Sequence, residues 1–383
     1  MQLSVNTSVP LMADPAHGHN RWHPDIFPIA HVRPYEEVEL QMRDALDGQI
    51  DERSEASDVR GIDPLRVHPL TGPLYVEGAE PGDLIELEIL SIDPARFGYT
   101  IVRPAVGPLG DLIEEPLLVH WQIKGALARS DELPGVTIRG APSIGVVGVA
   151  PSRERLRLMQ RREEDLLNVG GLVMPPDPRG AVPDGGEIAT AGLRTTAPRE
   201  TGGNLDIKQL AVGSRLLLRV DVRGALLSLG DAHFAQGDGE ICGQAIEVRA
   251  AVRIRVRLRK STSLSWHPHN PVLEYTDRPT TPARTHLVTT GVSVDESAVN
   301  HDRDLGVASR AALLEMVDYL RAVRGLDVGQ ACALCSVAVD LRVSELANAP
   351  NVLVSASLPL DVFDDSDEPA VAISEPPAPD SRD

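Results

Sequence analysis

The side chains best suited to chemistry lie in residues 230–243, where acidic and basic groups are interspersed with glycines. Asp231, His233, Gln236, Asp238 and Glu240 all fall within this segment. Asp231 and His233 are two residues apart, so on an extended segment their side chains point to the same side. A neutral imidazole beside carboxylates is a common way to hold a divalent ion, and an incomplete ligand shell leaves a position for water. The segment therefore predicts a metal site.

The same residues also have a simpler interpretation. Asp-Gly pairs favour turns on their own account, and an acidic turn can carry solvated carboxylates without any ligand. Spacing alone leaves this alternative open.

A second polar segment, residues 200–208, comes earlier in the chain and supplies Asn204, Asp206 and Lys208. Between the two segments, residues 214–229 predict a strand, because apolar side chains such as Leu216 alternate with charged ones. Each polar segment is therefore expected at a strand end, where a sheet holds functional loops in place.

Three motifs resemble those of the acetamidase/formamidase family. They are Gly-Gly-Asn-Leu-Asp at residues 202–206, Gly-Asp-Ala-His-Phe-Ala-Gln-Gly-Asp-Gly-Glu at residues 230–240, and His-Asn-Arg-Trp at residues 19–22. The likeness extends roughly over residues 19–343. It implies amide hydrolysis at a metal-assisted site, and the family's tendency to assemble implies a homo-oligomer.

The resemblance also suggests three residues for a substrate pocket. His19 and Trp22 match positions of the family pattern, and Asp44 lies in an Arg-Asp-Ala-x-Asp-Gly-Gln run that the family carries too. For His19 and Trp22 the alternative is a structural loop, and for Asp44 it is a solvated hairpin turn. The charged residues 50–62 that follow predict a mobile loop or a flap over the site.

The predicted mechanism places an ion on His233, Asp206 and Asp231. There it would polarise the amide carbonyl and lower the pKa of a water molecule. Glu240 or Asp238 would take the proton from the water and return it to the leaving nitrogen.

Three further residues are expected to act on the substrate carbonyl. Asn204, Gln236 or Lys208 would stabilise the oxyanion or orient the amide. Zinc is the expected metal, because a histidine among the ligands favours it over calcium, whose ligands are oxygens. Spacing does not decide which carboxylate is a ligand and which is the base.

Other functions fit the same residues. A small cyclic amide such as a γ-lactam would fit the same chemistry as a linear one. A calcium-stabilised β module that binds a ligand without reacting would have an all-oxygen site with His233 outside it. A metal-free hydrolase would need a nucleophile, and Cys242, beside the acidic segment, is the residue to test.

The composition narrows the class of protein and its partners. The chain has 383 residues, and its 56 Asp and Glu against 37 Lys and Arg give a net charge of -19, which argues against a nucleic acid or an anionic membrane as partner. Only 3 cysteines exclude a disulfide scaffold and suit a reducing cytoplasm. No apolar run approaches the ~20 residues that span a bilayer. We therefore expect a soluble, cytoplasmic enzyme that acts on a small amide or lactam.

Frequent turns and alternating runs predict a mostly β fold, with sandwich or barrel-like sheets and an α+β C-terminal part. Glycine and proline number 32 and 31. The expected division is an N-terminal part (1–150), a central part with the site loops (151–260), an α+β part (261–362) and a disordered acidic tail (363–383). Helices are expected at residues 152–167, 300–324 and 327–349.

Overall fold

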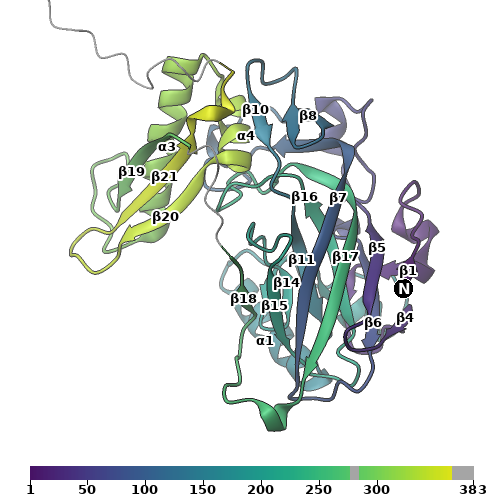
Figure 1. The fold of residues 1–383 in the computed structure, drawn as a ribbon. Helices are drawn as coiled ribbons and strands as arrows, with labels where there is room; N and C mark the ends of the chain where they lie inside the picture. The colour runs from purple at the N-terminus through teal and green to yellow at the C-terminus, as the bar shows by residue number, and fades with distance from the viewer. Residues whose placement is uncertain (277–283, 365–383) are drawn as a thin grey trace, which may run out of the picture.

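The computed structural model describes residues 1–276 and 284–364, and within them sixteen strands form one large sheet (Figure 1). The longer strands are β5 (Glu37–Met42), β6 (Leu70–Val76), β7 (Leu84–Val102), β8 (Leu117–Lys124), β11 (Ser143–Val149), β15 (Arg215–Arg219), β16 (Leu227–His233) and β17 (Glu247–Arg259). The shorter ones are β1 (Gln2–Leu3), β2 (Gly18–His19), β4 (Ala30–Val32), β9 (Leu127–Arg129), β10 (Thr137–Arg139), β13 (Pro198–Arg199), β14 (Gly202–Asn204) and β18 (Val272–Glu274). The prediction of a mostly β fold is confirmed.

The strand β17 organises the part of the sheet that matters for function. It pairs antiparallel with β7, with β5 and, at its beginning, with β16. Val252, Ile254 and Val256 of β17 are fully buried, because alternate side chains of a strand point to opposite faces. A separate two-stranded sheet joins β3 (Arg21–Trp22) to β12 (Leu193–Arg194).

The described residues contain four α-helices: α1 (Arg153–Asn168), α2 (Gly186–Ala191), α3 (Leu305–Arg324) and α4 (Val328–Ala338). Ser152 caps α1 by accepting the Arg155 backbone N–H at 3.2 Å. α3 ends at Gly325, whose φ of 68° is a left-handed conformation that glycine adopts without strain. The structure therefore has helices where residues 152–167 and 300–324 predicted them. None of the helices in these residues is long and apolar enough to cross a membrane.

The helix expected at residues 327–349 is wrong beyond Ala338. α4 ends there, and the chain continues as the strand β20 (Asp340–Glu345). β20 pairs antiparallel with β21 (Leu353–Pro359), which pairs in turn with β19 (His286–Val292). Most side chains of β20 are exposed or half-buried and show no regular alternation, so local periodicity did not indicate the strand.

The C-terminal part combines α3 with the three-stranded sheet β19, β21 and β20 and lies beside one end of the large sheet (Figure 1). α4 contacts β7 and β8 of the large sheet and thereby joins the two parts. Buried apolar residues of both parts belong to one continuous hydrophobic cluster. The predicted α+β C-terminal part is confirmed.

Two of the predicted boundaries need correction. β11 precedes residue 150 but pairs with β14 and β16, which follow it, so no sheet ends at that boundary. Phe363 is buried, and Asp364 lies 3.0 Å from Arg129, so both belong to the folded part. The rest of the predicted tail, residues 365–383, lies outside the described residues.

Candidate active site

Neighbouring strands bring the two polar segments together. β16 ends at His233, and its neighbour β17 begins with Glu247 directly opposite. β11 is another neighbour of β16, and β14 pairs with β11 just before the chain reaches Asp206. The Asp206 backbone N–H donates to the Gly145 carbonyl of β11 at 3.2 Å. The loop after β16 brings Glu240 to the same place.

Four carboxylates and one imidazole converge at this point. Ligand atoms of Asp206, His233 and Glu240 lie within 4.8 Å of one another, and so do those of Asp231, His233 and Glu247. The Nε2 atom of His233 is 3.4 Å from Asp231 Oδ1 and 3.5 Å from Glu247 Oε2. The structure thus gathers the three predicted ligands and places Glu240, a predicted proton carrier, beside them.

The side chain of Gln236 fixes the protonation of His233. Its amide nitrogen donates to the Asp206 backbone carbonyl at 2.6 Å, and a carbonyl oxygen can only accept. The amide oxygen of Gln236 therefore faces His233 Nδ1, at 2.8 Å, and Nδ1 carries the proton. The other ring nitrogen, Nε2, faces two carboxylates and has no hydrogen-bond partner. Either a second proton or a bound cation has to occupy the space between them.

Crowding shifts the pKa values of the acidic groups. Burial raises the pKa of Asp206, and the charge of Asp231 raises it further. Burial and the Asp206 charge hold the pKa of Glu240 well above its usual value, and burial does the same for Glu247. Asp231 differs, because neighbouring imidazoles outweigh its burial and lower its pKa. Carboxylates that oppose one another's ionisation in this way favour a bound cation.

Gly145 leaves the space in which an ion fits. A Cβ atom on this residue would lie 2.5 Å from Asp231 Oδ2 and 2.6 Å from Asp206 Oδ1. Asp206, Asp231 and Glu240 have φ values of 45°, 60° and 41°, in the left-handed region that strains non-glycine residues and recurs at functional sites. Buried oxygens of Asp206, Asp231 and Glu247 have no hydrogen-bond partner. This donor set and this space fit a divalent ion such as zinc.

The other predicted catalytic residues divide into two groups. Asn204 is the last residue of β14, and its side-chain oxygen is buried without a partner. Lys208 instead forms an ion pair with Asp340 and lies 3.6 Å from Asp238. Neither Lys208 nor Asp238 belongs to the cluster around His233. This placement favours Glu240 over Asp238 as the proton carrier.

His19 and Trp22 have the contacts of structural residues. His19 Nδ1 donates to the Arg21 carbonyl at 2.6 Å, so Nε2 accepts from the Ser228 hydroxyl at 2.7 Å. Burial lowers the pKa of His19 to about 4, which keeps the ring neutral. Trp22 is buried, and its ring packs edge-on against the His19 ring with 5.7 Å between the ring centroids. These contacts favour the structural alternative for both residues.

Asp44 lines a cavity of about 400 Å³ that also includes Glu247. Its carboxylate accepts from the Tyr99 hydroxyl at 2.8 Å and from Arg249 Nε at 3.3 Å. Residues 50–53, the beginning of the predicted flap, form part of the cavity wall. Because Glu247 belongs both to the cavity and to the cluster around His233, the two adjoin.

Two residues of the site, Glu247 and His68, were not predicted from the sequence. Glu247 comes opposite His233 through strand register, which the sequence alone does not give. One signal was present, since Glu247 is acidic where the other charged residues of β17 are arginines. His68 lies close enough that its charge favours the ionised forms of Asp231 and Asp206, and its Nδ1 is buried without a partner.

Cys242 does not have the surroundings of a nucleophile. Its side chain is buried, and its thiol contacts the Gln244 carbonyl at 3.6 Å. Burial raises the pKa of Cys242 to about 12, so the reactive thiolate is scarce at neutral pH. The alternative of a metal-free cysteine hydrolase therefore loses its candidate residue.

Comparison with known proteins identifies the family of the chain. The chain belongs to the acetamidase/formamidase family, whose family model matches residues 4–365. This confirms the resemblance that the three motifs carried.

The relatives include proteins named formamidase and acetamidase. The chain is 37% identical over 367 residues to the formamidase of Methylophilus methylotrophus, covering 90% of this chain and 89% of that protein. It is 36% identical over 354 residues to the acetamidase of Mycolicibacterium smegmatis, covering 83% and 85%.

Solved structures agree with this assignment. The γ-lactamase from Delftia acidovorans matches with a TM-score of 0.90 at 34% identity, over 96% of this chain and 95% of that one. The acetamidase from Bacillus halodurans matches with a TM-score of 0.54 at 29% identity, over 90% and 96%.

Proposed function

We propose that this protein hydrolyses the C–N bond of a small amide to give a carboxylate and ammonia. The observation that carries the proposal is the orientation of His233. Gln236 keeps the proton on Nδ1, so that Nε2 faces buried carboxylates across a space that fits an ion. The formamidase and acetamidase relatives support this reaction class.

The ion in this proposal is zinc, held by Asp206, Asp231 and His233 with Glu247 in reach. A histidine ligand whose other nitrogen is fixed by a hydrogen bond is typical of zinc sites, and Gln236 provides that bond. When bound, the ion polarises the amide carbonyl and lowers the pKa of a water molecule.

Glu240 is the proposed proton carrier. Burial and the Asp206 charge raise its pKa, and a raised pKa favours a carboxylate oxygen that accepts a proton and passes it on. That oxygen takes a proton from the attacking water as the new C–O bond forms. It then gives the proton to the nitrogen as the C–N bond breaks and ammonia leaves.

Asn204 is the proposed donor to the substrate carbonyl. Its amide nitrogen makes only a long contact, 3.5 Å, with the Thr196 carbonyl and can therefore turn toward a substrate. Gln236 and Lys208, the other candidates, already have close partners in His233 and Asp340.

The cavity beside Glu247 limits the size of the amide. Its volume of about 400 Å³ exceeds what a formyl group needs, and Phe97 and Tyr99 give it aromatic walls. Arg96 and Arg249 add polar groups at the same walls. A small γ-lactam therefore remains the second candidate substrate, and the Delftia acidovorans γ-lactamase supports it.

The test is a substrate panel measured before and after chelation. Ammonia release from formamide and acetamide, and ring opening of γ-lactams, should disappear with the chelator and return with added zinc. The preferred substrate then decides between the linear and the cyclic amide. Turnover that survives complete removal of metal would refute the metal-assisted mechanism, and no turnover of any amide would refute the reaction class.

We also propose that the enzyme is a cytoplasmic homo-oligomer. All three cysteines are buried free thiols, which suits a reducing compartment. Val169 and Leu172, in the segment after α1, are 81% and 93% exposed, and an exposed apolar segment favours association. Light scattering on the wild type and on Leu172→Glu should show an assembly that the substitution weakens. A monomeric wild type would refute this proposal.

A further inference from the structure

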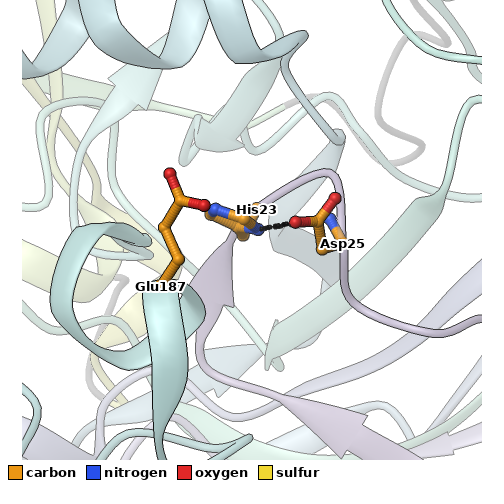
Figure 2. A group of neighbouring side chains, drawn as sticks. All are labelled: His23, Asp25 and Glu187. Atoms are coloured by element: carbon orange, nitrogen blue, oxygen red, sulfur yellow. Dashed lines mark hydrogen bonds and ion pairs between the residues drawn. The ribbon is translucent and has the colours of Figure 1, made fainter.

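A second group of potential metal ligands shares no residue with the cluster around His233. His23 directly follows β3, Asp25 lies two residues further on, and Glu187 is in the first turn of α2. One ligand atom from each lies within 4.8 Å of the others. Figure 2 shows the Asp25 and Glu187 carboxylates on either side of the His23 ring.

The imidazole of His23 is buried, whereas the two acids reach the solvent. His23 is 1% exposed, and the side chains of Asp25 and Glu187 are 42% and 55% exposed. The site is therefore open to ions on its acidic side and closed behind the ring.

One nitrogen of the His23 ring has no partner. The Asp25 backbone N–H donates to Nδ1 at 3.2 Å, and Asp25 Oδ2 lies 3.8 Å from the same atom. Nε2 is buried and has no hydrogen-bond partner. In Figure 2 the side of the ring away from Asp25 faces the Glu187 carboxylate. A buried polar atom without a partner is destabilising, so a ligand between His23 and Glu187 would be favourable.

Arg153, the first residue of α1, neutralises the two acids in this structure. Its Nη1 lies 3.1 Å from Glu187 Oε2, and its Nη2 contacts Asp25. The Arg153 side chain is half exposed, and exposed ion pairs of this kind contribute little to stability. The guanidinium carries a positive charge and therefore occupies the place of a cation between the two acids.

We propose that His23, Asp25 and Glu187 form a second site for a divalent transition-metal ion such as zinc, and that Arg153 competes with the ion for the two carboxylates. One imidazole with two carboxylates is a ligand set that zinc accepts. Ligation through Nε2 requires the ring proton to move to Nδ1, which now accepts from the Asp25 backbone N–H, so this hydrogen bond is given up. The proton is then on the side of the ring that lies 3.8 Å from Asp25 Oδ2, and carboxylates orient metal-bound histidines in this way.

The expected role of this site is structural. The ion would join the segment after β3 to α2, two segments that lie far apart in the sequence. A ligand that binds the folded chain and not the unfolded one raises stability. The proposal does not depend on the function of the His233 cluster.

The test uses Zn²⁺ itself, added to the full-length protein after chelation and dialysis. Calorimetry should count one zinc ion fewer per chain in Glu187→Gln than in Glu164→Gln, whatever the His233 cluster binds. Glu164 is the matched control, because it is an exposed carboxylate of α1 outside the site. Both substitutions are at exposed residues, so the folded chain is expected to tolerate them. Equal zinc content and equal affinity in the two variants would overturn the proposal.

Arg153→Gln is expected to change the zinc affinity in the opposite direction. Removing the competing guanidinium should tighten zinc binding at this site about threefold to tenfold. Zinc should also raise the thermal midpoint less in Glu187→Gln than in Glu164→Gln. Unchanged or weaker binding in Arg153→Gln would show that the cluster is only a set of surface ion pairs.

Discussion

His19 and His233 are both buried histidines in polar motifs, but their surroundings are opposite. Both nitrogens of His19 have neutral partners, the Arg21 carbonyl and the Ser228 hydroxyl. His233 has one partner, Gln236, and its Nε2 is left among carboxylates without a hydrogen bond. In this protein a ring nitrogen left without a partner among carboxylates, and not the density of polar residues, distinguishes His233 from the structural His19.

The difference has a physical cause. An unsatisfied buried polar group costs about 1–3 kcal/mol. The cluster around His233 contains such atoms on His233, Asp206, Asp231 and Glu247. A ligand at the cluster would compensate several of them at once, whereas both ring nitrogens of His19 already have partners.

The largest effect is expected from Glu240→Gln, which removes the proposed proton carrier from the cluster around His233. Amide turnover should fall on the order of a thousandfold, because general acid–base catalysis contributes about 10²–10⁴. Steady-state kinetics together with the zinc content of the variant would measure this. Asp238→Asn is the matched control and should retain most of the activity. A loss confined to Asp238→Asn would assign the proton transfer to Asp238 instead.

Gly145→Ala tests whether the space at the cluster is needed. The added methyl would displace the Asp231 and Asp206 oxygens that lie 2.5 and 2.6 Å from its position, and turnover should fall about a hundredfold. Zinc affinity should fall with it. Gly61→Ala is the control, since nothing lies within 4 Å of its Cβ position. Equal activity in the two variants would mean that no ion or water uses this space.

His19→Gln tests whether His19 is a neutral structural residue, through the free energy of unfolding at acidic pH. The folded-state pKa of His19, about 4, lies below the unfolded value of about 6.5, so the unfolded chain binds more protons between these pH values. The stability that neutral His19 contributes is therefore complete above pH 6.5 and is lost as the pH falls toward 4.

Denaturant unfolding at pH 7 and pH 4.5 would measure this contribution. Glutamine keeps one donor and one acceptor but does not titrate. The wild type should therefore lose about 2 kcal/mol more than His19→Gln over this interval. The same loss in both proteins would show that His19 is not the neutral, structural residue described above.

The smallest effect is expected from Lys208→Met. Lys208 pairs with Asp340, outside the cluster around His233, so turnover should change less than about threefold. The free energy of unfolding should fall by about 1 kcal/mol through loss of the partly buried ion pair. Kinetics and denaturant unfolding of the same sample separate the two effects. A loss of turnover comparable to that of Glu240→Gln would place Lys208 in the reaction.

Local spacing was enough to predict much of the site. Asp231 and His233 are at the end of β16, Asp206 and Glu240 lie in the loops after β14 and β16, and the structure gathers all four. Glu247 was not foreseen, because its place opposite His233 depends on the register of β16 and β17. His68 was not foreseen either, since it lies far in the sequence from the two polar segments that predicted the site.

The fold shows the same division between local and distant causes. α1 and α3 were predictable from caps and periodicity, which involve neighbours in the chain. The buried state of Phe363 was missed because its surroundings come from other segments of the chain. β20 was missed because its largely exposed side chains do not alternate. Trp22 and Asp44 were ambiguous for a related reason, as only the folded surroundings show which of them borders a cavity.

The most direct test of the account is a zinc titration of the chelated protein, with the rate of ammonia release from acetamide as the readout. The wild type should begin near the uncatalysed rate and rise with bound zinc to a plateau. His233→Ala should stay near the uncatalysed rate at every zinc concentration, while His19→Gln should follow the wild type. Full turnover in the metal-free wild type, or zinc-dependent turnover in His233→Ala equal to that of the wild type, would contradict the assignment of the His233 cluster as the catalytic site.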